Sequence, residues 1–338
     1  METAATIRTA VDQPLGTSQR DHLATAIFGT WMIAGLFLDG WAHTHDKPET
    51  FFSPWHGVLY SGFAAGMSFA VVNHRRRSRR TGNVGVDPLT LLGVGLFLAG
   101  GLADMVWHEI FGIEVDLEAL LSPSHLLLMV GGLFMLSAPI RWGLSEQGKA
   151  ATGLRTFLPT VVTLTLATAL VSFFLMFLSA FVPHDYVRVS GQISQSQQVH
   201  GVASVLVTNL LLVAPMLFVL RRLVPPAGTF TILFGGAALA MAGLEAFEYL
   251  PLAIPALVGG VIADTATARI RSGVRSAKDI RLIAALVPFA LWTSWFGMYA
   301  WAYGLNWPVE LWTGSIVLAV LSGVGLGLLA LPQATEPS

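Results

Sequence analysis

The sequence predicts an all-α polytopic membrane protein, with about ten transmembrane helices arranged as five repeated hairpins. Of its 338 residues, 54% are hydrophobic and only 12% are charged, whereas soluble domains average about a quarter charged residues. Mean hydropathy is +0.66, and apolar runs near the ~20 residues that a bilayer requires recur along the chain. These runs are continuous rather than alternating, which excludes a transmembrane β-barrel.

The helices are expected in order between two short tails. Residues 1–22 form a polar N-terminal tail, 23–331 a single transmembrane domain and 332–338 a C-terminal tail. The predicted spans lie at about 23–43, 54–73, 88–108, 123–140, 157–182, 199–220, 229–248, 251–267, 282–304 and 308–331. They pair as the hairpins 23–73, 88–140, 157–220, 229–267 and 282–331.

Basic residues gather in alternate loops. Arginines crowd the loop after the second span, between Arg75 and Arg80, and more basic residues follow the fourth, sixth and eighth spans. The other loops contain only Lys47 and Arg188. The positive-inside rule therefore places both termini in the cytoplasm and the His-bearing ends outside. Abundant Ala, Gly and Arg are typical of a GC-rich bacterial genome, so we expect a bacterial plasma membrane.

One motif occurs at the tip of the first hairpin. Its first span ends in Asp39-Gly-Trp-Ala-His43, and its second opens with Ser53-Pro-Trp-His56. Residues four apart share one helix face. Ser followed by Pro is typical of a helix N-terminus. The motif thus brings one carboxylate and two imidazoles together.

The second hairpin repeats this motif. Asp104-Met-Val-Trp-His108 ends one span, and Ser122-Pro-Ser-His125 opens the next. An aspartate inside a membrane costs about 2.5–3.5 kcal/mol on insertion scales and is usually functional. Imidazole with carboxylate suits copper, zinc or iron, and the chain has no Cys to supply thiolate. A structural hydrogen-bonded pair is the alternative, but the repetition of the motif favours a metal site.

The motif Asp-x3-His-x12-His resembles the metal motif of the C subunit of particulate methane and ammonia monooxygenases. The likeness covers about residues 25–140; the second copy has a longer loop and Asp104 where that subunit has Asn. The resemblance implies two copper-binding triads, Asp39, His43 and His56, and Asp104, His108 and His125. It also implies partner membrane subunits.

Later hairpins supply further candidates. His184 and His200 occupy the two His positions of the third hairpin and are expected as additional metal ligands, although Ala180 replaces the Asp. Glu245 and Glu248 end the seventh span, one helical turn apart, and are candidates for a general acid or base.

The leading hypothesis is a copper-binding membrane protein, with zinc and iron as alternative metals. It would act as an oxygen-dependent monooxygenase on a small apolar substrate, or as the metal-binding subunit of one. A zinc-dependent intramembrane hydrolase and a non-enzymatic copper-handling or transport protein are the alternatives. Expected partners are the lipid bilayer and either other membrane subunits or further copies of the chain, and not nucleic acid. The sequence leaves open whether the triads form one dinuclear centre or two mononuclear ones.

Overall fold

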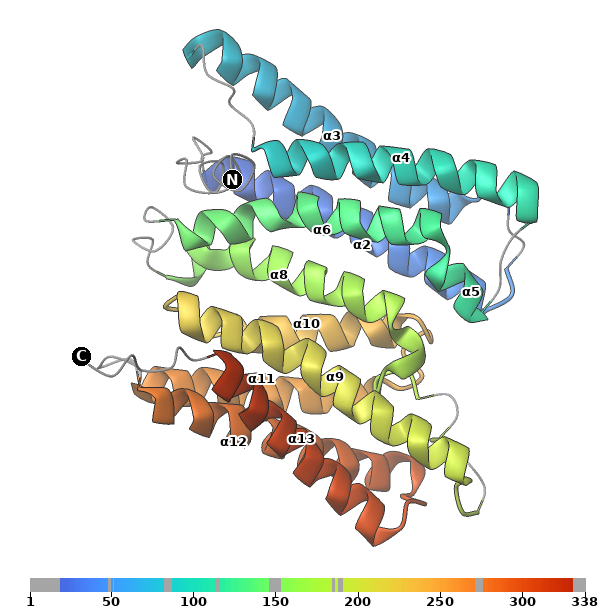
Figure 1. Ribbon diagram of the computed structural model, residues 1–338, viewed down its shortest axis with the longest axis vertical. Coiled ribbons are helices and arrows are strands. Elements are labelled where there is room, and N and C mark those ends of the chain that lie inside the picture. Colours follow the sequence, from blue (N-terminus) through green and yellow to red (C-terminus); the bar gives the residue numbers. More distant parts are fainter. Residues whose placement is uncertain are drawn as a thin grey trace, which may run out of the picture. The chain divides into compact units, whose positions relative to one another are not determined.

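Helices dominate the described part of the chain (Figure 1). The computed structural model describes residues 19–47, 50, 52–81, 87–112, 116–145, 153–183, 186–187, 191–270 and 276–330. Within these ranges there are 11 α-helices. Eight of them are long and apolar enough to cross a membrane: α2 (Gln19–Thr44), α4 (Pro88–Phe111), α6 (Pro123–Leu144), α8 (Leu154–Phe174), α9 (Gln195–Arg222), α11 (Leu250–Ile270), α12 (Ala277–Tyr303) and α13 (Val309–Ala330). By helix length and hydropathy the chain is a multi-pass membrane protein.

Each of the ten predicted spans contains a helix. The two outside the group of eight are α3 (Pro54–Thr81), whose apolar stretch is interrupted by small and polar residues, and α10 (Thr229–Gly243), which has 15 residues. A short helix that was not predicted, α5 (Asp116–Leu121), lies between α4 and α6. Of the predicted tails, 1–18 and 332–338 lie outside the described residues, and α2 already begins at Gln19.

The chain divides into two compact units, Met1–Leu170 and Val171–Ser338. The boundary falls near the end of α8, inside the predicted third hairpin. The pairing of that hairpin and the single domain 23–331 therefore stay predictions.

In the first unit, α2 and α3 pack backbone against backbone at two glycines. A Cβ on Gly35 would lie 2.5 Å from the backbone nitrogen of Leu59, and one on Gly62 would lie 2.7 Å from that of Met32. Real Cβ atoms do not approach so closely, so only glycine permits this contact. Small residues that let helix backbones approach are typical of packing inside membranes.

The second hairpin, α4 with α6, repeats this contact. A Cβ on Gly100 would lie 2.9 Å from the nitrogen of Leu128, and one on Gly131 would lie 2.5 Å from that of Phe97. In both hairpins the glycines stand four residues before the motif Asp and six after its second His. The first two hairpins thus repeat one another in their packing as well as in their motif.

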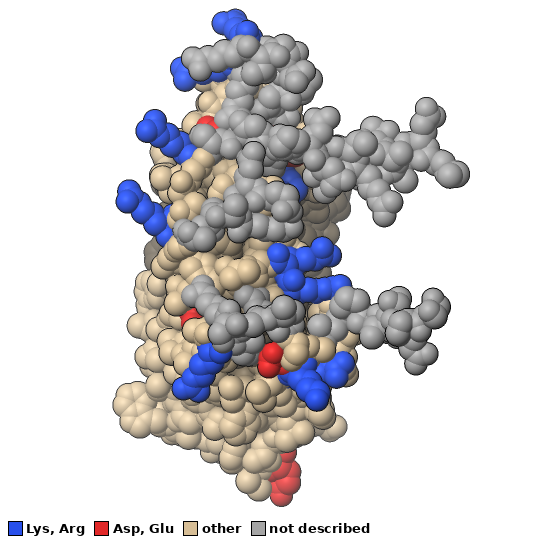
Figure 2. Space-filling view, turned by 90° about the vertical axis from the view of Figure 1, so that its left-hand side faces the viewer, with Lys and Arg blue, Asp and Glu red and all other residues tan. Residues whose placement is uncertain are grey.

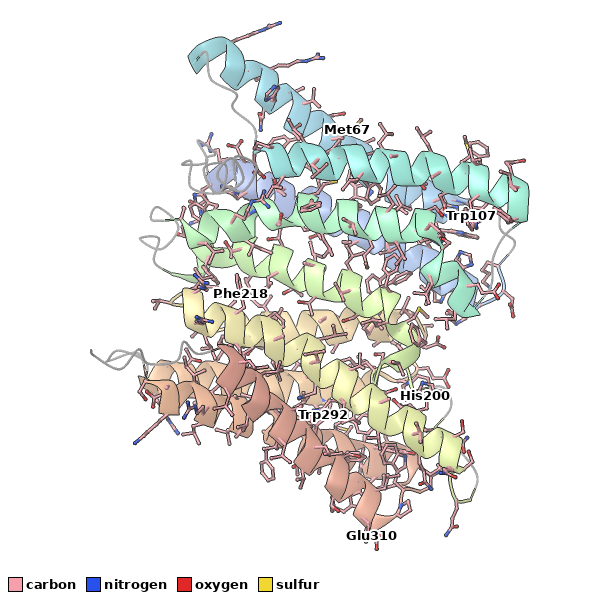
Figure 3. The ribbon with its side chains drawn as sticks, viewed as in Figure 1. Met67, Trp107, His200, Phe218, Trp292 and Glu310 are labelled. Atoms are coloured by element: carbon pink, nitrogen blue, oxygen red, sulfur yellow. The ribbon has the colours of Figure 1, made fainter. Side chains whose placement is uncertain are left out.

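A buried polar contact joins α9, α12 and α13 in the second unit. The Asn209 side chain donates to the Ala319 carbonyl (3.0 Å) and to Ser322 Oγ (2.8 Å), and its oxygen accepts from Trp292 Nε1 (3.0 Å). Asn209 and Trp292, the latter labelled in Figure 3, are both fully buried. Because every polar atom of the amide has a partner, this asparagine stabilises the unit rather than destabilising it.

Two predicted spans end earlier than expected. The span 157–182 leaves the helix at Phe174, and a 3₁₀ turn (Met176–Leu178) follows. Hydrogen bonds from other elements replace helical ones there: Ala180 N–H donates to Thr208 Oγ1 (2.9 Å), and Trp295 Nε1 donates to the Ala180 carbonyl (3.2 Å). Irregular backbone is tolerated at membrane depth when protein groups satisfy it in this way.

The span 229–248 ends at Gly243. Residues 244–249 form turns, in which Ala246 and Phe247 take left-handed conformations with φ of 48° and 65°. The expectation of Glu245 and Glu248 on one helical turn was therefore wrong, because the chain must reverse here before α11 begins at Leu250.

Lysine and arginine gather at one end of the helices in each unit, and Figure 2 faces this end. In the first unit these residues include Arg20, Arg75, Arg76, Arg79, Arg141 and Arg155, and in the second Arg221, Arg222, Arg269, Lys278 and Arg281. In the first unit, helix direction puts Asp39, His56, Asp104 and His125 at the opposite end. This segregation of charge is the pattern on which the predicted orientation rests.

The glycine contacts predict a stability difference between matched alanine variants. Gly35→Ala and Gly131→Ala each force two backbones apart, so we expect each to lower the free energy of unfolding by about 1–3 kcal/mol. Gly95→Ala is the control, because a Cβ there meets nothing within 4 Å. Thermal unfolding in detergent, followed by tryptophan fluorescence, measures the difference. Equal midpoints for all three variants would contradict this packing of the helices.

Candidate metal centre

The first triad lies where α2 ends and α3 begins. Asp39 and His43 share one face of α2, with Asp39 Oδ2 4.0 Å from His43 Nε2. His56, in the first turn of α3, places its Nε2 3.3 Å from Asp39 Oδ1. This Oδ1 is buried and accepts no hydrogen bond from the described residues. A buried carboxylate oxygen without a hydrogen bond is costly unless a cation compensates for it.

The second triad lies at the matching place in α4 and α6, and it is tighter. Asp104 Oδ2 lies 3.5 Å from His108 Nε2, and Asp104 Oδ1 lies 3.0 Å from His125 Nε2. Ser124 Oγ donates to the same Oδ1 at 3.1 Å. The ligand atoms of these three residues lie within 4.8 Å of one another, and they form the only such group of three or more in the described ranges.

These distances fit a shared metal ion. Copper-like and zinc-like ions bind imidazole nitrogen and carboxylate oxygen at about 2.0–2.2 Å, so two ligands at about 90–110° lie about 3.0–3.4 Å apart. The His125 contact of Asp104 Oδ1 (3.0 Å) and the Asp39–His56 contact (3.3 Å) fall in this range, and the His108 contact of Asp104 Oδ2 (3.5 Å) lies just above it. The Asp39–His43 contact is longer at 4.0 Å. The second triad is therefore the better-formed site.

Backbone carbonyls fix the orientation of the second His in each copy. His56 Nδ1 contacts the carbonyl of Thr50 (3.2 Å), and His125 Nδ1 contacts the carbonyl of Ala119, in each case six residues earlier. In the second copy that carbonyl belongs to α5, so the longer loop folds into a helix that restores the contact. A carbonyl only accepts, so a ring that makes this hydrogen bond has its proton on Nδ1 and turns Nε2 toward the carboxylate. His56 Nδ1 also contacts Ser53 Oγ, at 2.9 Å.

His108 is held in the same way. Its Nδ1 contacts the carbonyl of Gly112 at 3.2 Å. Gly112 ends α4 with φ of 82°, a conformation that favours glycine. A ligating imidazole whose other N–H is bonded to a carbonyl is the usual arrangement around protein-bound metals.

The imidazole orientation has an electrostatic consequence. With the proton on Nδ1, a neutral ring points the lone pair of Nε2 at the carboxylate oxygen, and two lone pairs repel. A proton carried by the ring or by the carboxyl group removes this repulsion, and so does a metal ion between the two atoms. The chemistry of the donor set, neutral nitrogen with carboxylate oxygen, fits copper, zinc or iron.

The two triads lie close enough to interact. Asp39 contacts His43 and His56 of its own triad, and it is close enough to Asp104, His108 and His125 for their charges to influence it. The Asp39–Asp104 interaction is repulsive, since both are carboxylates. Two buried negative charges in one region are the setting in which cations bind.

Tyr60 lies beside the first triad and close enough to Asp104 for electrostatic interaction, and it was not among the residues predicted from the sequence. It follows His56 by one helical turn on α3, with ring centroids 6.2 Å apart, and interacts electrostatically with both Asp39 and Asp104. Its ring packs on Gly101 of α4, where an added Cβ would lie 3.0 Å from Tyr60 Cε1. Its i+4 spacing from His56 was the one sequence feature that could have identified it. Comparison of the two hairpins could not, because Met129 stands at the equivalent position in α6.

The remaining predicted residues belong to the second unit. His184 lies outside the described residues. His200 is in the second turn of α9, and its Nε2 contacts the Phe177 carbonyl, while Tyr186 packs edge-on against its ring (5.6 Å). Glu245 is half-buried and Glu248 is exposed in the turn before α11. Their roles as ligands or as acid and base stay predictions.

No protein-family model, curated protein or solved structure matches this chain. Its own residues form a multi-pass membrane protein with a buried Asp104/His108/His125 group that could bind a metal.

Proposed function

We propose that the first unit is a copper centre at the extracytoplasmic face of a bacterial plasma membrane. One observation carries the proposal: Asp104, nearly fully buried, faces the Nε2 atoms of His108 and His125 at 3.5 and 3.0 Å, while carbonyls hold both Nδ1 atoms. Three protein ligands leave positions open for a small molecule. Copper also binds nitrogen and oxygen ligands most strongly among the divalent first-row metals.

The activity that we propose is oxygen-dependent oxidation of a small apolar molecule, by this chain or by a complex in which it is the metal-binding subunit. This part rests on the resemblance to the C subunit of particulate monooxygenases. A bound copper ion would supply the redox chemistry. The chain's own residues would orient the imidazoles, through the carbonyls, and hold Asp104 through Ser124. Apolar molecules dissolve in the bilayer, so a substrate of this class would reach the centre from the membrane.

We further propose that the two triads form one dinuclear centre. The repulsion between Asp39 and Asp104 supports this, because two cations would convert it into attraction to shared positive charge. Tyr60 would contact both halves. Stepwise loss of copper in single-site variants would separate one centre from two independent ones.

Metal content tests the proposal. We expect two copper ions per chain in detergent-purified protein, with His108→Ala and His43→Ala each losing copper and His74→Ala losing none. His74 is the matched control because it lies at the basic end of α3.

Ser124→Ala should weaken copper binding by about 10–100-fold, as for other residues that orient ligands. Plasma mass spectrometry and chelator competition measure both quantities. If His108→Ala lowers copper binding at the first triad as well, the sites are coupled.

Two outcomes would overturn the copper assignment. Zinc with the same mutant losses would favour the intramembrane hydrolase. Failure to retain copper, zinc or iron after reconstitution would mean that the positive charge between Asp104 and His125 is a proton, and that the triads are structural.

Tyr60 should affect the electronic structure of the centre but not its occupancy. Tyr60→Phe removes the hydroxyl of a ring that lies one helical turn from His56 and packs on Gly101. We expect unchanged copper content and a changed hyperfine splitting in the electron paramagnetic resonance spectrum of Cu(II). Gly101→Ala, which displaces the ring, should act in the same direction, and Tyr249→Phe in the second unit is the control. Identical spectra for all four proteins would remove Tyr60 from the centre.

The orientation can be tested on intact cells. The natural chain has no cysteine, so single cysteines can be introduced without background labelling. We expect Lys47→Cys to react with a membrane-impermeant maleimide from outside, and Arg155→Cys to react only after permeabilisation. The reverse pattern would place the triads on the cytoplasmic side.

A further inference from the structure

Three arginines in the last two turns of α3 are exposed. They are Arg75, Arg76 and Arg79, and they belong to the end of the unit at which Figure 2 shows lysine and arginine gathered. None of the three forms an ion pair within the described residues, whereas Arg141 at the same end pairs with Asp87. Their positive charges therefore have no counter-charge in the described part of the chain.

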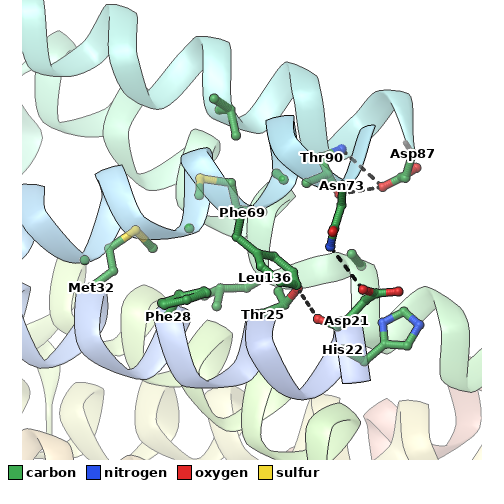
Figure 4. A pocket seen from close by; sticks show the side chains of 17 residues that line it. Asp21, His22, Thr25, Phe28, Met32, Phe69, Asn73, Asp87, Thr90 and Leu136 are labelled. Carbon is green, nitrogen blue, oxygen red and sulfur yellow. Dashed lines mark hydrogen bonds between the residues drawn. The ribbon is translucent and has the colours of Figure 1, made fainter. Parts of the chain in front are cut away.

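The contact between α2 and α3 sets the depth of these arginines. The two helices run antiparallel, and Met32 of α2 lies against Gly62 of α3. Eleven residues further along each helix, the Asn73 side chain donates to Asp21 Oδ1 at 3.0 Å (Figure 4). Asp21 is in the first turn of α2. Arg75 and the residues after it are therefore level with the start of α2 or beyond it.

Helix length gives the same depth. Val72 is the last apolar residue of α3 and follows Pro54 by 18 residues, which at 1.5 Å per residue is about 27 Å. The hydrocarbon core of a bilayer is about 30 Å thick. Because the three arginines follow Val72 within seven residues, they lie at the level of the lipid head groups.

The arginines continue a row of exposed residues along α3, which we call the exposed stripe. It consists, at steps of three or four residues, of Ala64, Ser68, Val72, Arg75, Arg76 and Arg79. Residues at this spacing share one helix face. Asn73, which bonds to α2, is on a different face, and Figure 1 shows the last turns of α3 projecting away from α4 and α6. The exposed stripe therefore faces lipid, first with small and apolar side chains and then with arginines.

Phosphate is the group that best matches these arginines. The planar guanidinium group donates two parallel N–H bonds to phosphate oxygens. Arginines that cluster just beyond a membrane helix attract lipids whose head groups carry a net negative charge. A zwitterionic lipid is a weaker ligand, because its own cation competes for the phosphate. A soluble polyanion is a poorer match than a lipid, because the stripe continues into the hydrocarbon region, where only acyl chains can follow it.

We propose that the exposed stripe binds an anionic phospholipid, with the head-group phosphate at Arg75, Arg76 and Arg79 and an acyl chain along the apolar part of the stripe. Two features together define the chemical class: a head group with net negative charge and attached acyl chains. Arg75 is 19 residues from His56 along α3, about 28 Å. The lipid site is therefore independent of the proposed copper centre.

Native mass spectrometry tests the proposal by identifying the lipids that stay bound. The full-length protein in detergent receives equal amounts of phosphatidylglycerol and phosphatidylcholine with the same acyl chains. We expect phosphatidylglycerol to be retained at least tenfold more than phosphatidylcholine. The midpoint of thermal unfolding, followed by tryptophan fluorescence, should rise with phosphatidylglycerol concentration. The rise should be smaller at high salt, because salt screens exposed charges.

Three double variants tie the effect to the exposed stripe. Arg75→Gln/Arg79→Gln removes two of its charges and should weaken phosphatidylglycerol binding at least tenfold. Arg75→Lys/Arg79→Lys keeps the charge without the planar guanidinium group, so its affinity should be intermediate. Arg221→Gln/Arg222→Gln is the matched control, because it removes the same charge from two exposed arginines at the end of α9, and it should bind like the natural protein. All these side chains are exposed, so unfolding midpoints without lipid should be equal and report on folding.

Four results would overturn the proposal. Equal phosphatidylglycerol binding by the natural protein and Arg75→Gln/Arg79→Gln would exclude the stripe, and an equal loss in the α9 control would indicate general attraction to the basic end. Equal retention of phosphatidylcholine would show that net charge is not recognised. Displacement of the lipid by an equal concentration of glycerol 3-phosphate, or of a single-stranded oligonucleotide, would show that the ligand is a soluble phosphate compound rather than a lipid.

Discussion

The first unit depends on backbone contact at four glycines. Gly35 against Leu59 and Gly62 against Met32 hold α2 on α3, and equivalent glycines hold α4 on α6. Such contact fixes the position of one helix along the axis of the other, because the backbone of the neighbouring helix can approach this closely only opposite a glycine. This packing places an aspartate near the end of one helix and a histidine near the start of the next at the same level along the helix axes. The triads are a consequence of this packing.

The sequence predicted much of this arrangement and missed specific parts for physical reasons. The length of the apolar runs predicted the helices. The i,i+4 spacing of Asp and His, together with the Ser-Pro pairs that begin the following helices, predicted both triads. The early end of α8 could not be predicted, because Thr208 and Trp295, distant in sequence, supply the hydrogen bonds that make it stable. The reversal at Ala246 and Phe247 was missed since neither is a residue that usually adopts positive φ. The position of Tyr60 was not predicted, because it depends on packing against Gly101, which lies on another helix.

The first two hairpins resemble each other in backbone packing but differ in the side chains that surround their triads. Asp104 accepts from Ser124, whereas Asp39 Oδ1 has no such donor among the described residues. The residue at the position of Ser124 is Trp55 in the first copy. Tyr60 likewise corresponds to Met129. Two copies of one hairpin therefore give a tighter and a looser triad, and under the proposed function the two would bind metal with different affinity.

The loop of the second copy separates its two histidines by 17 positions, compared with 13 in the first. The difference is four residues, close to one turn of helix at about 3.6 residues, and α5 takes it up while Ala119 still supplies the carbonyl that Thr50 supplies in the first copy. A loop that is longer by about one helical turn thus keeps the carbonyl contact of the second histidine. Between these two hairpins, the carbonyl contact is therefore a better sign of equivalence than the number of residues between the histidines.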